Sequence, residues 1–147
     1  WKMILHRREG FRKAFDNFNY RRIAGYKKEK VDALMQNTDI IRNKLKIRAA
    51  ITNAQAYIDV RQEFGSFDKY IWSFTEGKTI VNTWEKHQEI PAETELSNAI
   101  SMDLKNKGFK FVGSVICYAF MQAIGMVNDH TTDCFRYKQI KELANTP

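Results

Sequence analysis

Hydrophobic residues recur with helical spacing along most of this chain. Between residues 44 and 64, Ile47, Ile51, Ala54 and Ile58 follow one another at intervals of four, three and four, which places them on one side of a helix. Similar spacing predicts helices over residues 2–15, 27–36, 67–74, 95–107 and 137–143, with a helical turn at 20–24. No segment alternates like a half-buried strand. The pattern predicts an all-α protein that forms a single helical domain over residues 1–147.

Residues that favour helix ends support these boundaries. Asn19 and Ser66 directly precede two predicted helices, and their side chains are good N-caps. Gly25 and Gly65 directly follow two predicted helices, where glycine commonly ends the helical conformation.

The most hydrophobic segment lies near the C-terminus. From Phe111 to Asn128 no side chain is charged. A helix that is apolar on every side has to be surrounded, so residues 111–126 are predicted to form a central buried helix, with Cys117 as a packing thiol. A membrane span is the competing interpretation. Gly113 and Gly125 limit the helix to about a dozen residues, or about 18 Å, which is too short for a bilayer core.

A histidine and a cysteine follow this segment in a polar loop over residues 128–134. His130 and Cys134 are four residues apart, and imidazole and thiolate are both zinc ligands. A structural zinc site takes four ligands, and this pair supplies two. The spacing alone leaves a surface histidine and a chance thiol as the alternative.

Charge is unevenly distributed along the chain. The net charge is +7, with 14 Lys and Arg against 5 Asp and Glu in residues 1–50, and 10 against 12 in residues 51–147. A basic half suits a polyanion, although a solvated basic surface explains it equally well and an anionic membrane is a weaker alternative. Two cysteines are too few for a disulfide framework, so we expect a reducing compartment, the cytoplasm.

Turn-forming residues between the helices at 27–36 and 44–64 predict a hairpin over residues 37–48. Asn37, Thr38 and Asp39 favour a turn, and two isoleucines after them supply an apolar anchor. Such a turn can direct backbone N–H groups and the positive end of the second helix at a DNA phosphate. The candidate DNA-binding residues are Ile40, Ile41, Arg42, Asn43, Lys44 and Lys46. An ordinary turn between antiparallel helices is the alternative.

Three ordered blocks resemble the 3-methyladenine DNA glycosylase I family. They are Gly108–Cys134, Asp39–Arg48 with Asn53 and Ala54, and Ile71–Phe74. The resemblance spans the chain from Trp1 to about Cys134. It implies a helix-hairpin-helix DNA glycosylase fold and a monofunctional enzyme of base-excision repair. That enzyme hydrolyses the N-glycosidic bond of 3-methyladenine in double-stranded DNA and releases the free base. It also implies a monomer with no membrane partner.

The same resemblance assigns roles to individual residues. His130 and Cys134 match two of the four structural zinc ligands of the family, and Trp1 matches its base-stacking tryptophan. The resemblance implies further residues upstream of Trp1, including the other two zinc ligands and an acidic residue of the base pocket. The catalytic residue is therefore unknown and is expected upstream of Trp1. Ala119 stands where the family has a pocket serine, and Asp39 and Leu45 stand where many such hairpins have glycine.

Two other functions compete with the glycosylase. A non-enzymatic helix-hairpin-helix module would share the hairpin and the basic half, but would not need Trp1 or a zinc loop. A metal-dependent hydrolase would need a cluster of carboxylates and histidines, which the sequence does not show. Release of an alkylated base separates the first alternative from the enzyme.

Overall fold

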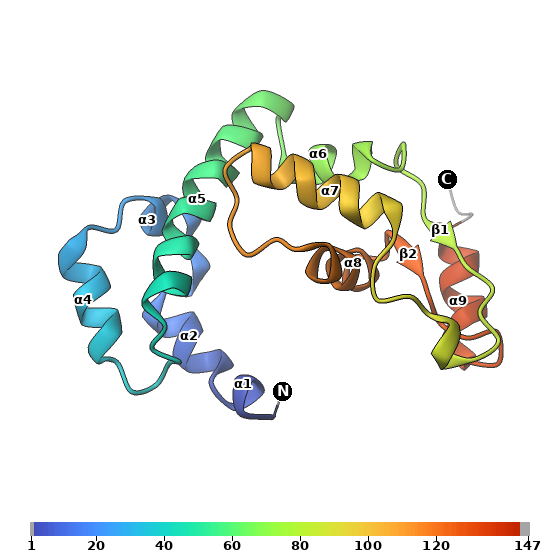
Figure 1. Cartoon of the computed structure of the whole chain (residues 1–147), viewed down its shortest axis with the longest axis horizontal. Coiled ribbons are helices and arrows are strands. Elements are labelled where there is room, and N and C mark those ends of the chain that lie inside the picture. The colour runs from blue at the N-terminus through green and yellow to red at the C-terminus, as the bar shows by residue number, and fades with distance from the viewer. Residues whose placement is uncertain (1, 145–147) are drawn as a thin grey trace. The chain divides into compact units, whose positions relative to one another are not determined.

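Helices make up most of the structure, as the spacing of apolar residues predicts (Figure 1). The computed structural model describes residues 2–144. Internal contacts divide the chain into two compact units, Trp1–Gly65 with Lys107–Phe111, and Ser66–Asn106 with Val112–Pro147. The grouping of all residues into one domain stays a prediction.

The first unit is built around its longest helix, α5, against which α3 and α4 pack (Figure 1). Ile23 of α3, Leu34 of α4 and Ile47 of α5 are buried in one apolar cluster, together with Ile40 from the connection between α4 and α5. The elements of this unit are α1 (Lys2–His6), α2 (Arg8–Ala14), the 3-10 turn η1 (Asp16–Phe18), α3 (Tyr20–Ala24), α4 (Lys28–Gln36) and α5 (Lys44–Phe64).

The helix predicted over residues 2–15 is interrupted at Arg7, so that prediction is wrong in detail. The φ and ψ angles of Arg7 are −94° and 1°, and its guanidinium donates a hydrogen bond to the carbonyl of Thr38, far along the chain. The predicted cap of α3 is confirmed, because the Asn19 side chain accepts hydrogen bonds from two backbone N–H groups of that helix. Gly65, with a φ of 81°, follows the last residue of α5 as expected.

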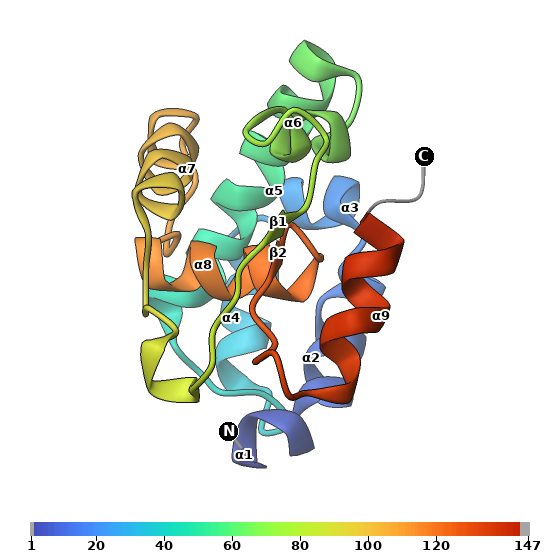
Figure 2. The ribbon, with the colours of Figure 1, turned by 90° about the vertical axis from the view of Figure 1, so that its right-hand side faces the viewer.

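The second unit combines helices with a very short parallel pair of strands. Figure 2 shows β1 and β2 side by side, with α9 next to β2. The elements of this unit are α6 (Phe67–Ser73), β1 (Ile80–Val81), the 3-10 turn η2 (His87–Glu89), α7 (Glu95–Asn106), α8 (Ser114–Ala123), β2 (Val127–Asn128) and α9 (Phe135–Ala144). Strands of two residues are too short to show an alternating pattern, which is why the sequence did not predict them.

The predicted central helix is shorter and less covered than expected. It is α8, Ser114–Ala123, and it packs against α7. Cys117, Tyr118 and Met121 are buried, whereas Val115 and Ile116 are 53% and 58% exposed. The prediction that residues 111–126 are buried on every side is therefore wrong for the described part of the chain. Uniform hydropathy shows that a helix is apolar, but not how much of it is covered.

Helix length within residues 2–144 also bears on the membrane alternative. None of the helices in this range combines the length and apolar content needed to cross a bilayer. Cys117 is a buried packing thiol, as predicted, and it donates a weak hydrogen bond to the carbonyl of Val112 at 3.5 Å. Burial raises the pKa of this thiol.

Candidate DNA-binding hairpin and metal-binding loop

The predicted hairpin is a compact turn fixed at both ends by asparagine side chains. At its start, Asn37 Oδ1 accepts a 2.8 Å hydrogen bond from the N–H of Asp39. At its end, Asn43 caps α5, because its Oδ1 accepts a 3.1 Å hydrogen bond from the N–H of Lys46. Between them Ile40 is 2% exposed and belongs to the apolar core. The turn is therefore anchored from inside by Ile40, while its polar and charged residues Thr38, Asp39, Arg42 and Asn43 are exposed.

The start of α5 offers backbone donors to a ligand. Within residues 2–144, the N–H groups of Lys44 and Leu45 donate to no protein acceptor. The first N–H groups of any helix lack a partner inside the helix, and the helix dipole makes this end positive. A helix of 21 residues thus presents two donors and a partial positive charge at one end of the hairpin. This arrangement suits an anion such as a phosphate.

Cationic side chains surround these donors. Arg42, Lys44 and Lys46 are all exposed, and none of the three forms an ion pair with another described residue. The candidate DNA-binding residues are thus brought together, with the exception that the Ile40 side chain is turned inward and can contribute only its backbone.

The lack of glycine in the hairpin does not strain it. No residue from 37 to 43 has a positive φ. Asp39 therefore does not adopt the left-handed conformation that favours glycine. The glycine that matters is in α2 instead. A Cβ on Gly10 would lie 2.4 Å from the carbonyl oxygen of Asp39, so the bare backbone of α2 lets the hairpin pack directly on it. Leu45, the second non-glycine position, is exposed on the first turn of α5.

The loop over residues 128–134 brings the predicted metal-binding pair together. The buried Asn128 organises this loop, because its Oδ1 accepts a hydrogen bond from the N–H of His130 at 3.3 Å and its Nδ2 donates to the carbonyl of Tyr137 at 3.2 Å. As a result, Cys134 Sγ lies 3.6 Å from His130 Nδ1.

This separation fits a shared zinc ion. Ligands at about 2.3 Å for sulfur and about 2.0 Å for nitrogen, held at a tetrahedral angle, lie about 3.5 Å apart. The described residues contain no group of three or more His, Cys, Asp or Glu placed to hold one metal ion. Because of their 3.6 Å separation, His130 and Cys134 fit two corners of a tetrahedral site.

The sequence did not reveal the most connected side chain of the second unit, Asp129. This carboxylate accepts four side-chain hydrogen bonds, from Asn82 at 2.7 Å, Trp84 at 2.8 Å, Tyr118 at 2.6 Å and Gln122 at 2.8 Å. Burial raises the pKa of Asp129, but the four hydrogen bonds outweigh burial and hold it below the usual value. Asp129 thus ties the segment after β1 and the helix α8 to the loop that carries His130.

Two other predicted positions have different outcomes. Trp1 lies outside the described residues. Ala119 lines a cavity of about 640 Å³ in the second unit together with His130 and Arg136. The position where the family has a serine is thus close to the predicted metal-binding loop.

Comparison with known families gives one match over most of the chain. The family model described as methyladenine glycosylase matches residues 1–137. Among curated proteins, the DNA-3-methyladenine glycosylase 1 of Escherichia coli is 42% identical over 137 residues, which cover 93% of this chain and 73% of that protein.

Solved structures give the same result. A crystal structure of a 3-methyladenine DNA glycosylase I superposes with a TM-score of 0.86 at 45% identity, covering 92% of this chain and 74% of that one. A structure of the Staphylococcus aureus 3-methyladenine DNA glycosylase I, described in terms of 3-methyladenine recognition, superposes with a TM-score of 0.87 at 32% identity, covering 92% and 72%.

Proposed function

This chain belongs to the 3-methyladenine DNA glycosylase I family, and on that premise we propose how its residues remove 3-methyladenine from DNA. The activity is that of a DNA-3-methyladenine glycosylase, an N-glycosylase that binds and releases the alkylated base. The observation that carries this function is the match of the family model to residues 1–137, which includes both the hairpin and the metal-binding loop.

The reaction needs little general acid catalysis from the protein. Adenine methylated on a ring nitrogen already carries a positive charge while it is attached to the sugar. When the glycosidic bond breaks, its electron pair neutralises the base, water adds to the sugar carbon, and the proton of that water passes to solvent. The enzyme has to take the base out of the stack and bind its cationic ring. Trp1 supplies the ring for this contact, since an indole face attracts a cation.

The hairpin docks the duplex. The free N–H groups of Lys44 and Leu45 bind one backbone phosphate, with Arg42, Lys44 and Lys46 adding charge. Ile40 holds the turn against the core, and Asn43 fixes the start of α5. Contacts of this kind position the protein on double-stranded DNA without reading its sequence.

His130 and Cys134 serve a structural zinc ion. Their 3.6 Å separation supports a shared tetrahedral ion for which they supply two ligands. When bound, such an ion holds a loop in place and takes no part in the reaction. His130 and Cys134 would hold the ion from the loop between β2 and α9, next to the cavity that includes Ala119. We further propose that the protein acts in the cytoplasm, in keeping with two free cysteines among the described residues. We also propose that it is a monomer, as the family resemblance implies.

The non-enzymatic alternative predicts binding without chemistry, so base release is the test. The full-length protein is mixed in excess with duplex DNA that has been methylated to contain 3-methyladenine, and the free base is separated by chromatography. We expect release of 3-methyladenine with intact DNA strands. Tight binding of the same duplex without any release of base would favour the non-enzymatic module instead.

A further inference from the structure

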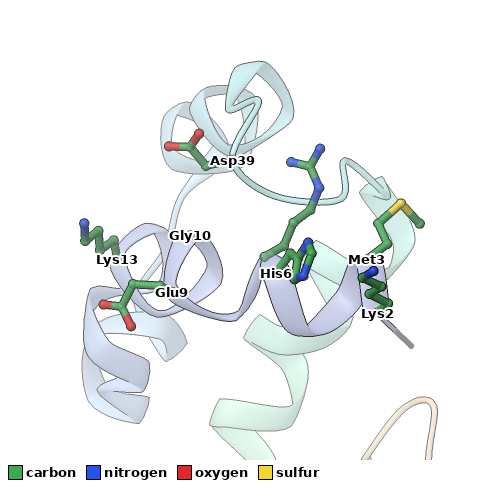
Figure 3. A pocket seen from close by; sticks show the side chains of 8 residues that line it. Lys2, Met3, His6, Glu9, Gly10, Lys13 and Asp39 are labelled. Atoms are coloured by element: carbon green, nitrogen blue, oxygen red, sulfur yellow. The ribbon is translucent and has the colours of Figure 1, made fainter.

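A basic cavity lies beside the hairpin in the first unit (Figure 3). Its volume is about 770 Å³. Lys2 and His6 reach it from α1 and Lys13 from α2, while the hairpin residue Asp39 stands next to Gly10. Neither the family match nor the predicted hairpin residues assign any role to this cavity.

The cations of the cavity are free to bind a ligand. Lys2, His6 and Lys13 are exposed and form no ion pair or side-chain hydrogen bond with another residue in the range 2–144. The neighbouring Glu9 already has a partner, since Arg12 Nε lies 3.3 Å from its carboxylate. The cavity therefore presents two lysine charges and a histidine side chain that pair with no other described residue.

The cavity and the hairpin form one continuous surface. The guanidinium of Arg7 donates to the carbonyl of Thr38, which ties the junction of α1 and α2 to the turn. Gly10 allows the backbone of α2 to touch that of Asp39, where any Cβ would lie 2.4 Å from the carbonyl oxygen. The free cations are thus held at a fixed place relative to the phosphate site at the start of α5.

We propose that this cavity binds a second backbone phosphate of the DNA, with Lys2 and Lys13 as its cationic side chains and His6 as a hydrogen-bond donor. Each strand of a duplex carries a phosphate about every 3.4 Å along the axis, so DNA docked on the hairpin presents further phosphates to the surface beside it. Lysine suits this contact as a flexible point charge. The carboxylate of Asp39, which forms no ion pair among the described residues, repels phosphate, so neither proposed phosphate should lie directly against it. The proposal rests on the docking of DNA by the hairpin.

The test compares two double variants that lose the same charge. Lys2→Ala/Lys13→Ala removes the cavity cations, and Lys69→Ala/Lys138→Ala removes two exposed lysines of the second unit. Binding of an unmodified duplex to the full-length proteins is measured between about 50 and 200 mM salt. We expect the cavity variant to lower the salt slope by about 1 and the control variant to leave it unchanged. Equal slopes in the two variants would overturn the proposal.

Three further variants separate this inference from the function it rests on. If Lys44→Ala lowers the salt slope and the cavity variant does not, the hairpin binds DNA and the second phosphate site is wrong. If both lower the slope, and the variant that combines Lys2→Ala, Lys13→Ala and Lys44→Ala lowers it by the sum of the two effects, the two sites hold different phosphates. Asp39→Asn should tighten binding, because it removes a repulsive charge without changing the side-chain shape; weaker binding would contradict the assigned role of Asp39.

A competition experiment distinguishes binding of DNA phosphate from binding of a free anion. Inorganic phosphate is added at constant ionic strength to the wild-type protein and the DNA affinity is measured again. We expect no change, because a single lysine-bound phosphate in water is weak and the duplex brings many together. Competition by inorganic phosphate, with an unchanged salt slope in the cavity variant, would mean that the cavity holds a small anion and not DNA.

Discussion

The hydroxyl of Tyr118 donates a 2.6 Å hydrogen bond to the carboxylate of Asp129, the residue directly before His130. This bond links the buried face of α8 to the loop proposed to hold zinc, and three other side chains share the same carboxylate. Burial raises the pKa of Tyr118, and the hydrogen bond to Asp129 raises it further, so the phenol stays protonated and remains a donor. The loop is therefore held in place by side chains of the protein itself.

The first prediction concerns this network. Asp129→Ala leaves four donors without their acceptor and should lower the free energy of unfolding by on the order of 3 kcal/mol, whereas Tyr118→Phe removes one hydrogen bond and should cost about 1–2 kcal/mol. Urea unfolding measures both. Asp59→Ala, at an exposed position of α5, is the control and should change stability by less than about 0.5 kcal/mol. A loss in Asp129→Ala no larger than in the control would mean that the network contributes nothing.

A second prediction concerns pH and the first unit. The pKa of Asp16 lies below its usual value near 3.8, chiefly because the Tyr26 hydroxyl donates to it, and Lys30 and Arg22 lie nearby. A carboxyl with a lowered pKa stabilises the fold fully above its unfolded pKa, and this contribution disappears as the pH falls through the folded pKa.

Wild type and Asp16→Asn should therefore differ in urea midpoint above about pH 5, and the difference should shrink as the pH falls below about 3.8 and through the lowered folded pKa of Asp16. Tyr26→Phe removes the main donor and should show a smaller dependence on pH over the same range. A difference between wild type and Asp16→Asn that grows as the pH falls would have the wrong sign for this explanation.

The sequence predicted the fold where local signals decide it. The bounds of α5 follow from Asn43 and Gly65, which favour the start and the end of a helix whatever surrounds them. The interruption at Arg7 depends on a hydrogen bond to Thr38, 31 residues away, and no local pattern contains that information. The same limit applies to α8, because its apolar composition does not show which of its sides is covered.

The candidate site could also be predicted only in part. His130 and Cys134 do lie close together, but their four-residue spacing alone left a chance pair as the alternative, and the family resemblance was needed to predict a shared site. Asp129 gave no signal, because its donors come from the segment after β1 and from α8, which are far from each other in sequence. The cavity near Lys2 was also missed. Its basic residues were counted in the charge of residues 1–50, but the packing of α2 on Asp39 forms the cavity.

The third prediction tests the hairpin. Arg42→Ala, Lys44→Ala and Lys46→Ala each remove one exposed charge beside the free N–H groups of α5. A variant that loses a phosphate contact should bind all duplexes more weakly and lower the salt slope by roughly 1. Fluorescence anisotropy with two duplexes of different sequence measures both effects. Slopes that are unchanged in all three variants would place the DNA surface elsewhere.

The fourth prediction concerns metal. Metal analysis of the full-length protein should give about one zinc per chain, since a structural site takes four protein ligands and holds one ion. Cys134→Ser should lose that zinc and lower the thermal midpoint. Cys117→Ala is the matched control, because this thiol is buried in the second unit and donates to Val112, so the zinc content should not change. A wild-type protein purified without zinc, and unaffected by Cys134→Ser, would rule out the site.

The last prediction concerns Trp1 and the flipped base. If Trp1 stacks on the cationic ring and transfers no proton, Trp1→Ala in the full-length protein should lose on the order of 1–3 kcal/mol of affinity for the base, as base–aromatic stacks do. Trp1→Phe should keep part of that affinity, because a phenyl face also attracts a cation, though less than indole. Binding of unmodified duplex should barely change in either variant, since phosphate contacts dominate it.

Binding of free 3-methyladenine to wild type, Trp1→Phe and Trp1→Ala distinguishes these roles. A graded loss in this order, with duplex affinity preserved, supports stacking on the base. Trp72→Phe serves as a control for the loss of an indole elsewhere, because Trp72 belongs to α6 in the second unit. Since Trp72 is assigned no contact with the base, this variant should bind 3-methyladenine as wild type does. Equal affinity in wild type, Trp1→Phe and Trp1→Ala would mean that Trp1 does not contact the base.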